Sequence, residues 1–259
     1  MICQTVEVPT LAPMLPEGIE VRVSRDPFDV AAAQRLRYRV FYDEKGARPC
    51  PLTRASGLDA DAFDEVCDHL VVLAEGEVIG TYRLVRRTAA QLVGGFYSAA
   101  EFDITALEAQ GGEILELGRS CIDARWRNRG AVQLLWQGVA AYIVQHGIDL
   151  LFGCASLPGT QLTALAPQLA YLRDHHLAPP GLRARPLGDN AITLDGLPAV
   201  LDPRRVFMSL PPLVKGYLRA GAMISDGAVM DHQFNTTDVL MVLNTAAIAS
   251  RYQRRYAQG

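Results

Sequence analysis

The amino-acid sequence predicts an α/β fold in which a central, mixed and twisted sheet is flanked by helices. Two observations support this prediction. Apolar runs that end at turn residues alternate along the chain with stretches of helical periodicity. Between Glu113 and Leu157 a strand, an amphipathic helix and a second apolar strand follow one another. That is the order of a βαβ-like unit with two parallel strands.

The first third of the chain carries clear start and stop signals. An alternating strand is predicted from Ile19, and Asp26–Pro27 is typical of the start of a helix, which Gly46 would end. Residues 47–66 contain proline, aspartate and glycine and are predicted to form a long loop. Two apolar runs around Gly76 then indicate a β-hairpin.

Beyond the hairpin the clearest period belongs to a helix from Ala131, where Val132, Leu135, Val139 and Ile143 recur at helical spacing. The other elements predicted here are a connecting helix and loop at 88–112, a strand from Glu113, a strand from Leu150, a helix from Gln161 to His175 and a helix from Leu213.

These elements are predicted to form one domain, residues 19–259, with a C-terminal elaboration from about residue 176 and an N-terminal tail, residues 1–18. A chain of 259 residues with 49% hydrophobic content can bury one large core. The net charge of −3 favours no nucleic-acid partner. The apolar stretch at 130–148 contains three glutamines and a histidine, so we do not expect it to span a membrane.

Cysteine usage indicates a reducing compartment. The chain has an odd number of cysteines and no C-x-x-C spacing, so neither a disulfide framework nor a metal site is expected. The N-terminus has no charged start followed by an apolar core, as a secretory signal would. A cytoplasmic protein is therefore expected.

The turn Arg127–Val132 lies between the predicted strand and helix. A helix N-terminus presents unpaired N–H groups and partial positive charge, and Gly130 would let a phosphate approach the backbone. Arg127 and Arg129 could add bidentate contacts. An ordinary polar turn fits the same residues.

The preceding strand, ELGRSCI, carries two ionisable residues within an apolar run, Glu116 and Arg119. Such residues are rarely buried in a strand without a partner or a task. Gly118 suggests a β-bulge that would bring both side chains to one face and free a backbone N–H as an oxyanion donor. A structural Glu–Arg ion pair is the alternative.

The strand, the R-x-x-G turn and the helix together resemble the acyl-thioester-binding core of GNAT acyltransferases, in which Arg or Gln, two residues, Gly, one residue, and Gly or Ala follow in order. Arg127 and Gly130 match this motif, and Val132 departs from it. The resemblance implies a GNAT fold, a thioester donor and binding of the donor by Ser120, Cys121, Arg127, Arg129, Gly130, Ala131 and Val132.

Motifs spread over nearly the whole chain resemble the hemolysin-like branch of this superfamily, which includes L-ornithine N(α)-acyltransferases. They include LRYRVFYDE from Leu36, FDEVCDHLVVL from Phe63, ELGRSCI and LPPLVKGYLRAGA. The resemblance implies transfer of a 3-hydroxyacyl group from the 4′-phosphopantetheine of acyl carrier protein to the α-amine of ornithine, giving lyso-ornithine lipid, with no permanently bound cofactor. More distantly, the spacing resembles that of acyl-homoserine-lactone synthases.

Amide formation from a thioester requires a neutral amine, oxyanion donors and aligned reactants. Glu116 is predicted to be the general base or to position the amine, with Arg119 orienting it or binding the acceptor carboxylate. The residues predicted to bind the acceptor are Arg37, Asp64, Asp68 and Arg83. For Asp64 and Asp68 a solvated acidic loop is the alternative. Cys121 and His69 are predicted to be structural rather than catalytic.

Arg125, Arg127 and Arg129 would suit an acidic carrier protein. The basic segment Arg251–Tyr256 could contact the inner face of an anionic membrane, or be a solvated tail. Two other functions are kept as alternatives. One is an acyltransferase of the same fold with another acceptor, as in the autoinducer synthases; the other is a carrier- or membrane-binding module without chemistry.

Overall fold

The computed structural model describes residues 18–127 and 130–246. Within these ranges the chain divides into two compact units. Unit 1 contains residues 18–95 and 116–148, and unit 2 contains residues 96–115 and 149–246. The predicted tail, residues 1–18, lies outside the described residues except for Gly18.

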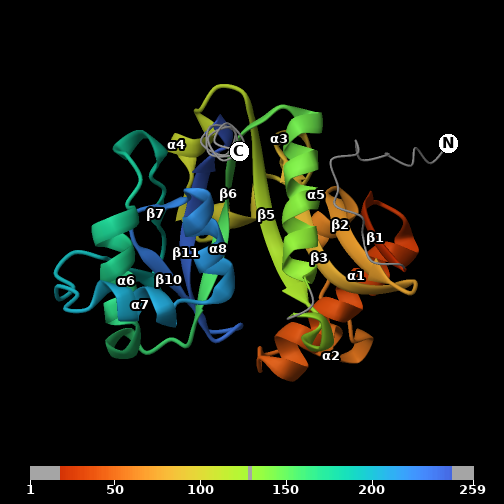
Figure 1. The fold of residues 1–259 in the computed structure, drawn as a ribbon, viewed down its shortest axis with the longest axis horizontal. Coiled ribbons are helices and arrows are strands. Elements are labelled where there is room, and N and C mark those ends of the chain that lie inside the picture. The colour runs from red at the N-terminus through yellow and green to blue at the C-terminus, as the bar shows by residue number, and fades with distance from the viewer. Residues whose placement is uncertain (1–17, 128–129, 247–259) are drawn as a thin grey trace, which may run out of the picture. The chain divides into compact units, whose positions relative to one another are not determined.

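Unit 1 is an antiparallel sheet with helices on both faces (Figure 1). Its elements are β1 (Ile19–Ser24), α1 (Pro27–Tyr38), the π-helical turn η1 (Arg39–Glu44), α2 (Pro51–Ser56), the 3-10 turn η2 (Ala62–Glu65), β2 (Asp68–Ala74), β3 (Glu77–Arg86), α3 (Arg87–Leu92), β5 (Glu113–Ile122, shared with unit 2), the 3-10 turn η4 (Ala124–Trp126) and α5 (Ala131–His146). The strand order is β1-β2-β3-β5, and β1, β2 and β3 pair antiparallel.

Strand β2 explains why unit 1 needs a helix on each face. Side chains alternate along a strand, and here both sets are apolar. Val71 and Leu73 belong to a core cluster with Leu36 of α1. Leu70, on the other face, meets α5 so closely that a Cβ on Gly138 would lie 2.5 Å from its side chain. The two helices therefore cover opposite faces of β2.

Several predicted boundaries of unit 1 are confirmed. The Asp26 side chain accepts from the N–H of Phe28, and Pro27 is the first residue of α1. The hairpin turns at Glu75 and Gly76, whose φ angles are 51° and 82°. Helix α5 ends before Gly147, as predicted. Its buried face, however, is formed by Ala131, Leu135, Gly138, Val139 and Tyr142, while Val132 and Ile143 are only partly buried.

The predicted loop at 47–66 is wrong in part. Helix α2 begins at Pro51, where Cys50 caps it, and it ends at Gly57 in a left-handed conformation. Turn η2 follows Asp61, whose side chain forms a capping box with Asp64. These local caps form helical turns too short to produce a hydrophobic period.

Unit 2 contains an antiparallel sheet in the order β6-β11-β10-β8, with β9 also paired to β11. Its elements are η3 (Tyr97–Ala100), β4 (Phe102–Asp103), α4 (Thr105–Glu108), β6 (Ile148–Pro158), α6 (Leu162–His176), η5 (Pro180–Leu182), β7 (Arg185–Pro186), β8 (Ala191–Ile192), α7 (Pro203–Ser209), α8 (Pro212–Ala220), β9 (Met223–Ile224), β10 (Ala228–Asp231) and β11 (Thr236–Asn244). Helices α6 and α8 contact β9 and β11 respectively, and bury Leu169 and Leu218 among other residues.

Within the described residues, no helix is both long and apolar enough to cross a membrane. The four cysteines in this part of the chain, Cys50, Cys67, Cys121 and Cys154, are all free thiols.

Candidate active site

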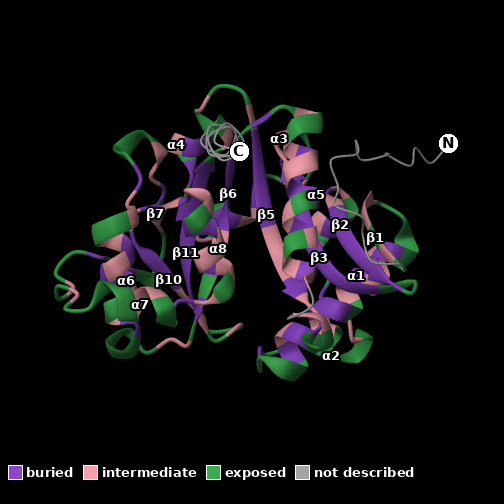
Figure 2. Ribbon diagram, viewed as in Figure 1, coloured by how far each residue is buried: buried purple, intermediate pink, exposed green. Residues whose placement is uncertain are grey.

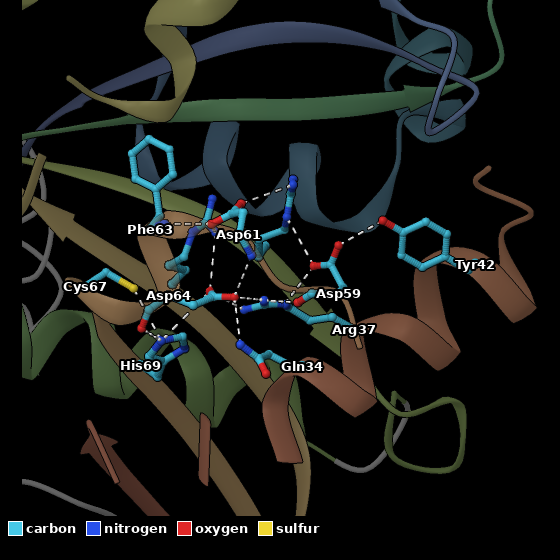
Figure 3. Close-up of polar contacts among 11 residues, drawn as sticks. Gln34, Arg37, Tyr42, Asp59, Asp61, Phe63, Asp64, Cys67 and His69 are labelled. Atoms are coloured by element: carbon cyan, nitrogen blue, oxygen red, sulfur yellow. Dashed lines mark hydrogen bonds and ion pairs between the residues drawn. The ribbon is translucent and has the colours of Figure 1, made fainter. Parts of the chain in front are cut away.

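A network of buried charges lies in unit 1, where α1, the segment before η2, η2, β3 and β5 contribute one or two side chains each (Figure 3). We call it the Asp64 network. Its charged members are Arg37, Asp59, Asp61, Asp64, Arg83 and Arg119.

Asp64 lies at its centre. Arg37 donates to both carboxylate oxygens of Asp64, Nη1 to Oδ1 at 3.0 Å and Nη2 to Oδ2 at 2.6 Å. Gln34 donates at 3.0 Å and Arg83 at 3.4 Å. Arg37 Nε also donates to Asp59 at 2.8 Å. Burial alone would raise the pKa of Asp64, but the guanidinium groups of Arg37 and Arg83 hold it well below its usual range.

Asp59 and Asp61 link this centre to β5. Tyr42 donates to Asp59 at 3.0 Å, and Arg119 Nε lies 3.2 Å from the same carboxylate. Arg83 donates to Asp61 at 2.6 Å, and Arg119 Nη2 lies 3.6 Å from Asp61. Arg119 is therefore paired with aspartates that are far from it in the sequence.

The three aspartates and three arginines balance in charge, as buried ions must to be tolerated. The side chains of Arg37, Asp64 and Arg83 are 1–2% exposed. Those of Asp61 and Arg119 are 28% and 16% exposed. The accessible edge of the network thus presents a carboxylate beside a guanidinium, which suits a ligand that carries both charges.

Strand β5 carries the predicted catalytic residues. Glu116 is buried, with 2% of its surface exposed. Arg119 has a φ of 51°, in the left-handed region, so the alternation of faces is interrupted here. The sequence predicted a β-bulge at Gly118, and the irregularity lies at the next residue, Arg119. Ser120 is half-buried and Cys121 is buried.

The turn before α5 is built differently. Arg127 donates to both oxygens of Glu44 and, through Nε, to the carbonyl of Ile122 at 3.1 Å. Gly130 is the N-cap of α5, with a φ of 85° and no side chain to cap the helix N–H groups. Ala131 is buried and Val132 is half-buried. Arg129 lies outside the described residues.

Among the described residues, two groups of side chains lie close enough together to hold a common ion. Asp64, Cys67 and His69 are all buried, but Asp64 is already held by two arginines and burial raises the pKa of Cys67 to about 12. These residues therefore belong to the Asp64 network. In unit 2, Glu101, Asp231 and Asp238 lie within 4.8 Å of one another.

Comparisons with known proteins fit this architecture. Residues 36–137 match the acetyltransferase (GNAT) domain family. The chain is 45% identical to L-ornithine N(alpha)-acyltransferase from Agrobacterium fabrum over 92% of the chain and 85% of the relative. It is 40% identical to the protein of that name from Rhodobacter capsulatus, over 94% and 96%. The chain belongs to the L-ornithine N(α)-acyltransferase family of GNAT acyltransferases.

Among solved structures, an N-acyl amino acid synthase from uncultured soil microbes is 14% identical, with a TM-score of 0.49 over 90% of this chain and 93% of that one.

Two residues of this acyltransferase, Cys121 and His69, are buried, which agrees with the structural role predicted for them. Burial raises the pKa of Cys121 to about 12, so its thiol stays protonated near neutral pH and is a poor nucleophile. His69 is completely buried, and its Nε2–H donates to the carbonyl of Asp64 at 3.1 Å. Burial also lowers the pKa of His69, which favours its neutral form.

Asp68, a predicted acceptor ligand of the acyltransferase, lies apart from the Asp64 network in a second cluster. Arg25 and the hydroxyl of Tyr142 both contact its carboxylate at 2.5 Å. Arg86 lies 3.9 Å away. Direct contact of Asp68 with a substrate stays a prediction.

Sequence reasoning predicted Asp64 but missed Asp59 and Asp61, which lie in the same stretch predicted to be a loop. One signal could have found Asp61. Asp-x-x-Asp at 61–64 has the spacing of a capping box, which predicts a helical turn that brings both carboxylates together. No comparable signal marks Asp59.

Proposed function

We propose that the protein transfers a fatty acyl group from a thioester to the α-amino group of L-ornithine. The observation that carries this proposal is the similarity to relatives of that name, at 40–45% identity over more than 90% of the chain.

The acceptor amine must lose a proton before it attacks the thioester carbonyl, because an α-amine is largely protonated at neutral pH. Glu116 is our candidate for the group that accepts this proton or positions the amine. It is a carboxylate buried in β5, three residues before the left-handed Arg119. In our proposal the backbone at Ser120 and Cys121 stabilises the developing oxyanion.

Binding of a free amino acid requires partners for a carboxylate and an ammonium. Arg119 and Asp61, at the accessible edge of the Asp64 network, offer both. We assign the acceptor carboxylate to Arg119 and an ammonium group to Asp61. Arg37, Asp64 and Arg83, predicted from sequence as direct ligands, are so buried that we assign them the task of holding this pair in place.

For the donor we propose a 3-hydroxyacyl group on the 4′-phosphopantetheine of acyl carrier protein, with lyso-ornithine lipid as product. Two features support this. Val132 is bulkier than the Gly or Ala that GNAT enzymes carry where the diphosphate of coenzyme A lies. The uncapped N-terminus of α5, after Gly130, still suits the single phosphate of a pantetheine arm.

A direct assay tests acceptor and donor separately. The purified protein is incubated with 3-hydroxyacyl-carrier protein, or with the matching coenzyme A thioester, and a panel of amino acids, and products are identified by mass spectrometry. We expect N(α)-acylornithine from the carrier-bound donor. Acylation of another amino acid alone would contradict the proposed acceptor, and product from coenzyme A alone would contradict the donor.

The role of Glu116 has its own test. We expect Glu116→Gln to lower kcat about 100- to 10,000-fold, the usual contribution of a general base, with partial recovery at high pH where the free amine is deprotonated. Glu113→Gln, on the same strand, is the matched control and should retain activity. Full activity of Glu116→Gln across pH would remove Glu116 from the mechanism.

A further inference from the structure

Helix α7 of unit 2 presents an outward face of unusual composition. Three side chains of α7 follow helical spacing, namely Arg204, Arg205 and Met208, and Leu201 lies just before the N-cap of the helix, Asp202. All four are exposed, and Figure 2 shows α7 coloured mainly as exposed. Two cations thus lie between two large apolar side chains in the sequence.

The opposite face of α7 accounts for its attachment to the protein. The ring of Phe207 lies 6.1 Å from that of Tyr171 on α6, and the guanidinium of Arg219 lies over Phe207 at 5.6 Å. Gln168 donates to the hydroxyl of Ser209 at 3.1 Å. These contacts hold α7 without any contribution from the outward face.

Leu201 is the residue least expected at such a position. It precedes the N-cap, Asp202, where an apolar residue commonly packs against the fourth residue of the helix as a hydrophobic staple. Leu201 is 99% exposed and makes no such contact. Met208, one helical turn beyond Arg204, is 66% exposed. Single exposed apolar residues are common, but two such residues at the ends of one short helix, with two cations between them in the sequence, favour a binding surface.

Arg204 and Arg205 carry the positive charge of this face. Within the described part of the chain, neither Arg204 nor Arg205 forms a side-chain ion pair. The nearest carboxylate in sequence, Asp202, is turned to the backbone and accepts from the N–H of Arg205 at 3.0 Å. Two free guanidinium groups therefore face outward.

We propose that the outward face of α7 is a docking surface for an anionic lipid bilayer. Leu201 and Met208 would insert among the acyl chains, while Arg204 and Arg205 would lie at the level of the phosphate groups. An acidic protein could satisfy the arginines, but a fully exposed leucine and a methionine beside them fit an apolar phase better. The surface does not depend on the proposed acceptor or donor, because it is defined without substrate.

Binding of the full-length protein to vesicles tests this surface. Co-sedimentation is measured with vesicles of phosphatidylglycerol and phosphatidylcholine in equal parts, and with vesicles of phosphatidylcholine alone, at low and at raised salt. We expect binding to the anionic vesicles that weakens with salt. Absence of binding to anionic vesicles at low salt would overturn the proposal.

Variants then locate the surface. Removal of a cation near an anionic bilayer costs about 1 kcal/mol, so Arg204→Gln with Arg205→Gln should lower the partition coefficient about 30-fold. Leu201→Ser with Met208→Ser should lower it about tenfold or more at both salt concentrations, since it removes inserted apolar surface. Because all four residues are exposed, thermal unfolding of these variants should match that of the wild type.

Two controls separate this surface from other parts of the chain. Leu52→Ser with Arg54→Gln changes an exposed leucine and an exposed arginine on α2 and should leave vesicle binding unchanged. Replacement of Arg251, Arg254 and Arg255 by glutamine tests the basic C-terminal segment, which lies outside the described residues. Loss of binding only in that variant, or loss of carrier-protein binding rather than vesicle binding in the α7 variants, would overturn the proposal.

Discussion

The Asp64 network and the turn before α5 are both made of arginines and carboxylates, and both lie in unit 1. They differ in burial. Arg37 and Asp64 are 1% and 2% exposed, whereas Arg127 and Glu44 are 37% and 39% exposed. A buried ion that loses its partner leaves an uncompensated charge, while an exposed ion is solvated by water. The same pair of residue types is therefore structural in one place and replaceable in the other.

The largest effect is expected at the centre of the network. Asp64→Asn leaves Arg37 and Arg83 with less negative charge in a buried site, so we expect a loss of about 3–5 kcal/mol in the free energy of unfolding. Urea unfolding followed by circular dichroism measures it. A loss below 1 kcal/mol would mean that the network is hydrated and that the contrast with the exposed turn fails.

The next largest effect concerns the acceptor. Arg119→Gln removes a charged donor, and hydrogen bonds to charged groups contribute about 1.5–3 kcal/mol, so the KM for the acceptor should rise about tenfold to 100-fold. Steady-state kinetics with acceptor and donor varied in turn measures this. Arg127→Gln is the matched change in the turn and should leave the acceptor KM unaltered. Equal effects of both variants on acceptor KM would contradict the assignment.

Low pH should destabilise the protein in part through the Asp64 network. The pKa of Asp64 is lowered on folding, so its ionised form stabilises the native state above the unfolded pKa, near 3.8, and this stability is lost as the pH falls below that value. Hydrogen bonds from Arg125 likewise hold the pKa of Asp123 at about 2. We expect the urea midpoint to fall steadily below about pH 4, and to fall less steeply in Asp64→Asn. If the urea midpoint of Asp64→Asn fell with pH as steeply as that of the wild type, the loss of stability in acid would come from other groups.

A smaller effect is expected for the exposed pair. Glu44→Gln breaks the contact with Arg127, whose hydrogen bonds lower the pKa of Glu44. Exposed pairs contribute about 0–1 kcal/mol, and we expect a change in unfolding free energy within that range. Chemical denaturation of Glu44→Gln and Asp64→Asn in parallel measures the two losses in unfolding free energy. A loss comparable to that of Asp64→Asn would show that burial is not what separates the two sites.

The smallest effect is expected at Cys121. Its pKa of about 12 leaves little thiolate near neutral pH, so Cys121→Ala should retain kcat. Peptide mapping of the wild type after alkylation under native conditions should find Cys121 unmodified, whereas the exposed Cys50 reacts. Loss of activity in a folded Cys121→Ala variant, together with an acyl-enzyme detected by mass spectrometry, would replace direct transfer by a covalent mechanism.

Local rules predict much of unit 1. The start of α1 at Asp26–Pro27, the hairpin at Glu75–Gly76 and the end of α5 at Gly147 all follow from residues within one turn of the boundary. Helix α2 was missed because its six residues are too few to show a period, although Cys50 and Gly57 cap it. Short elements defined by caps are the ones that periodicity does not detect.

The sequence by itself determined the α/β class, the family, and the presence of Glu116 and Arg119 within an apolar strand, because composition, local caps and alternation are read over a few residues. Tertiary structure alone decided which charges meet. Arg119 pairs with Asp59 and Asp61 and Arg127 with Glu44, across 60, 58 and 83 positions of the chain. Burial then separated the two arginines into different roles, since the energy of an ion pair depends on its solvent and no local pattern reports that.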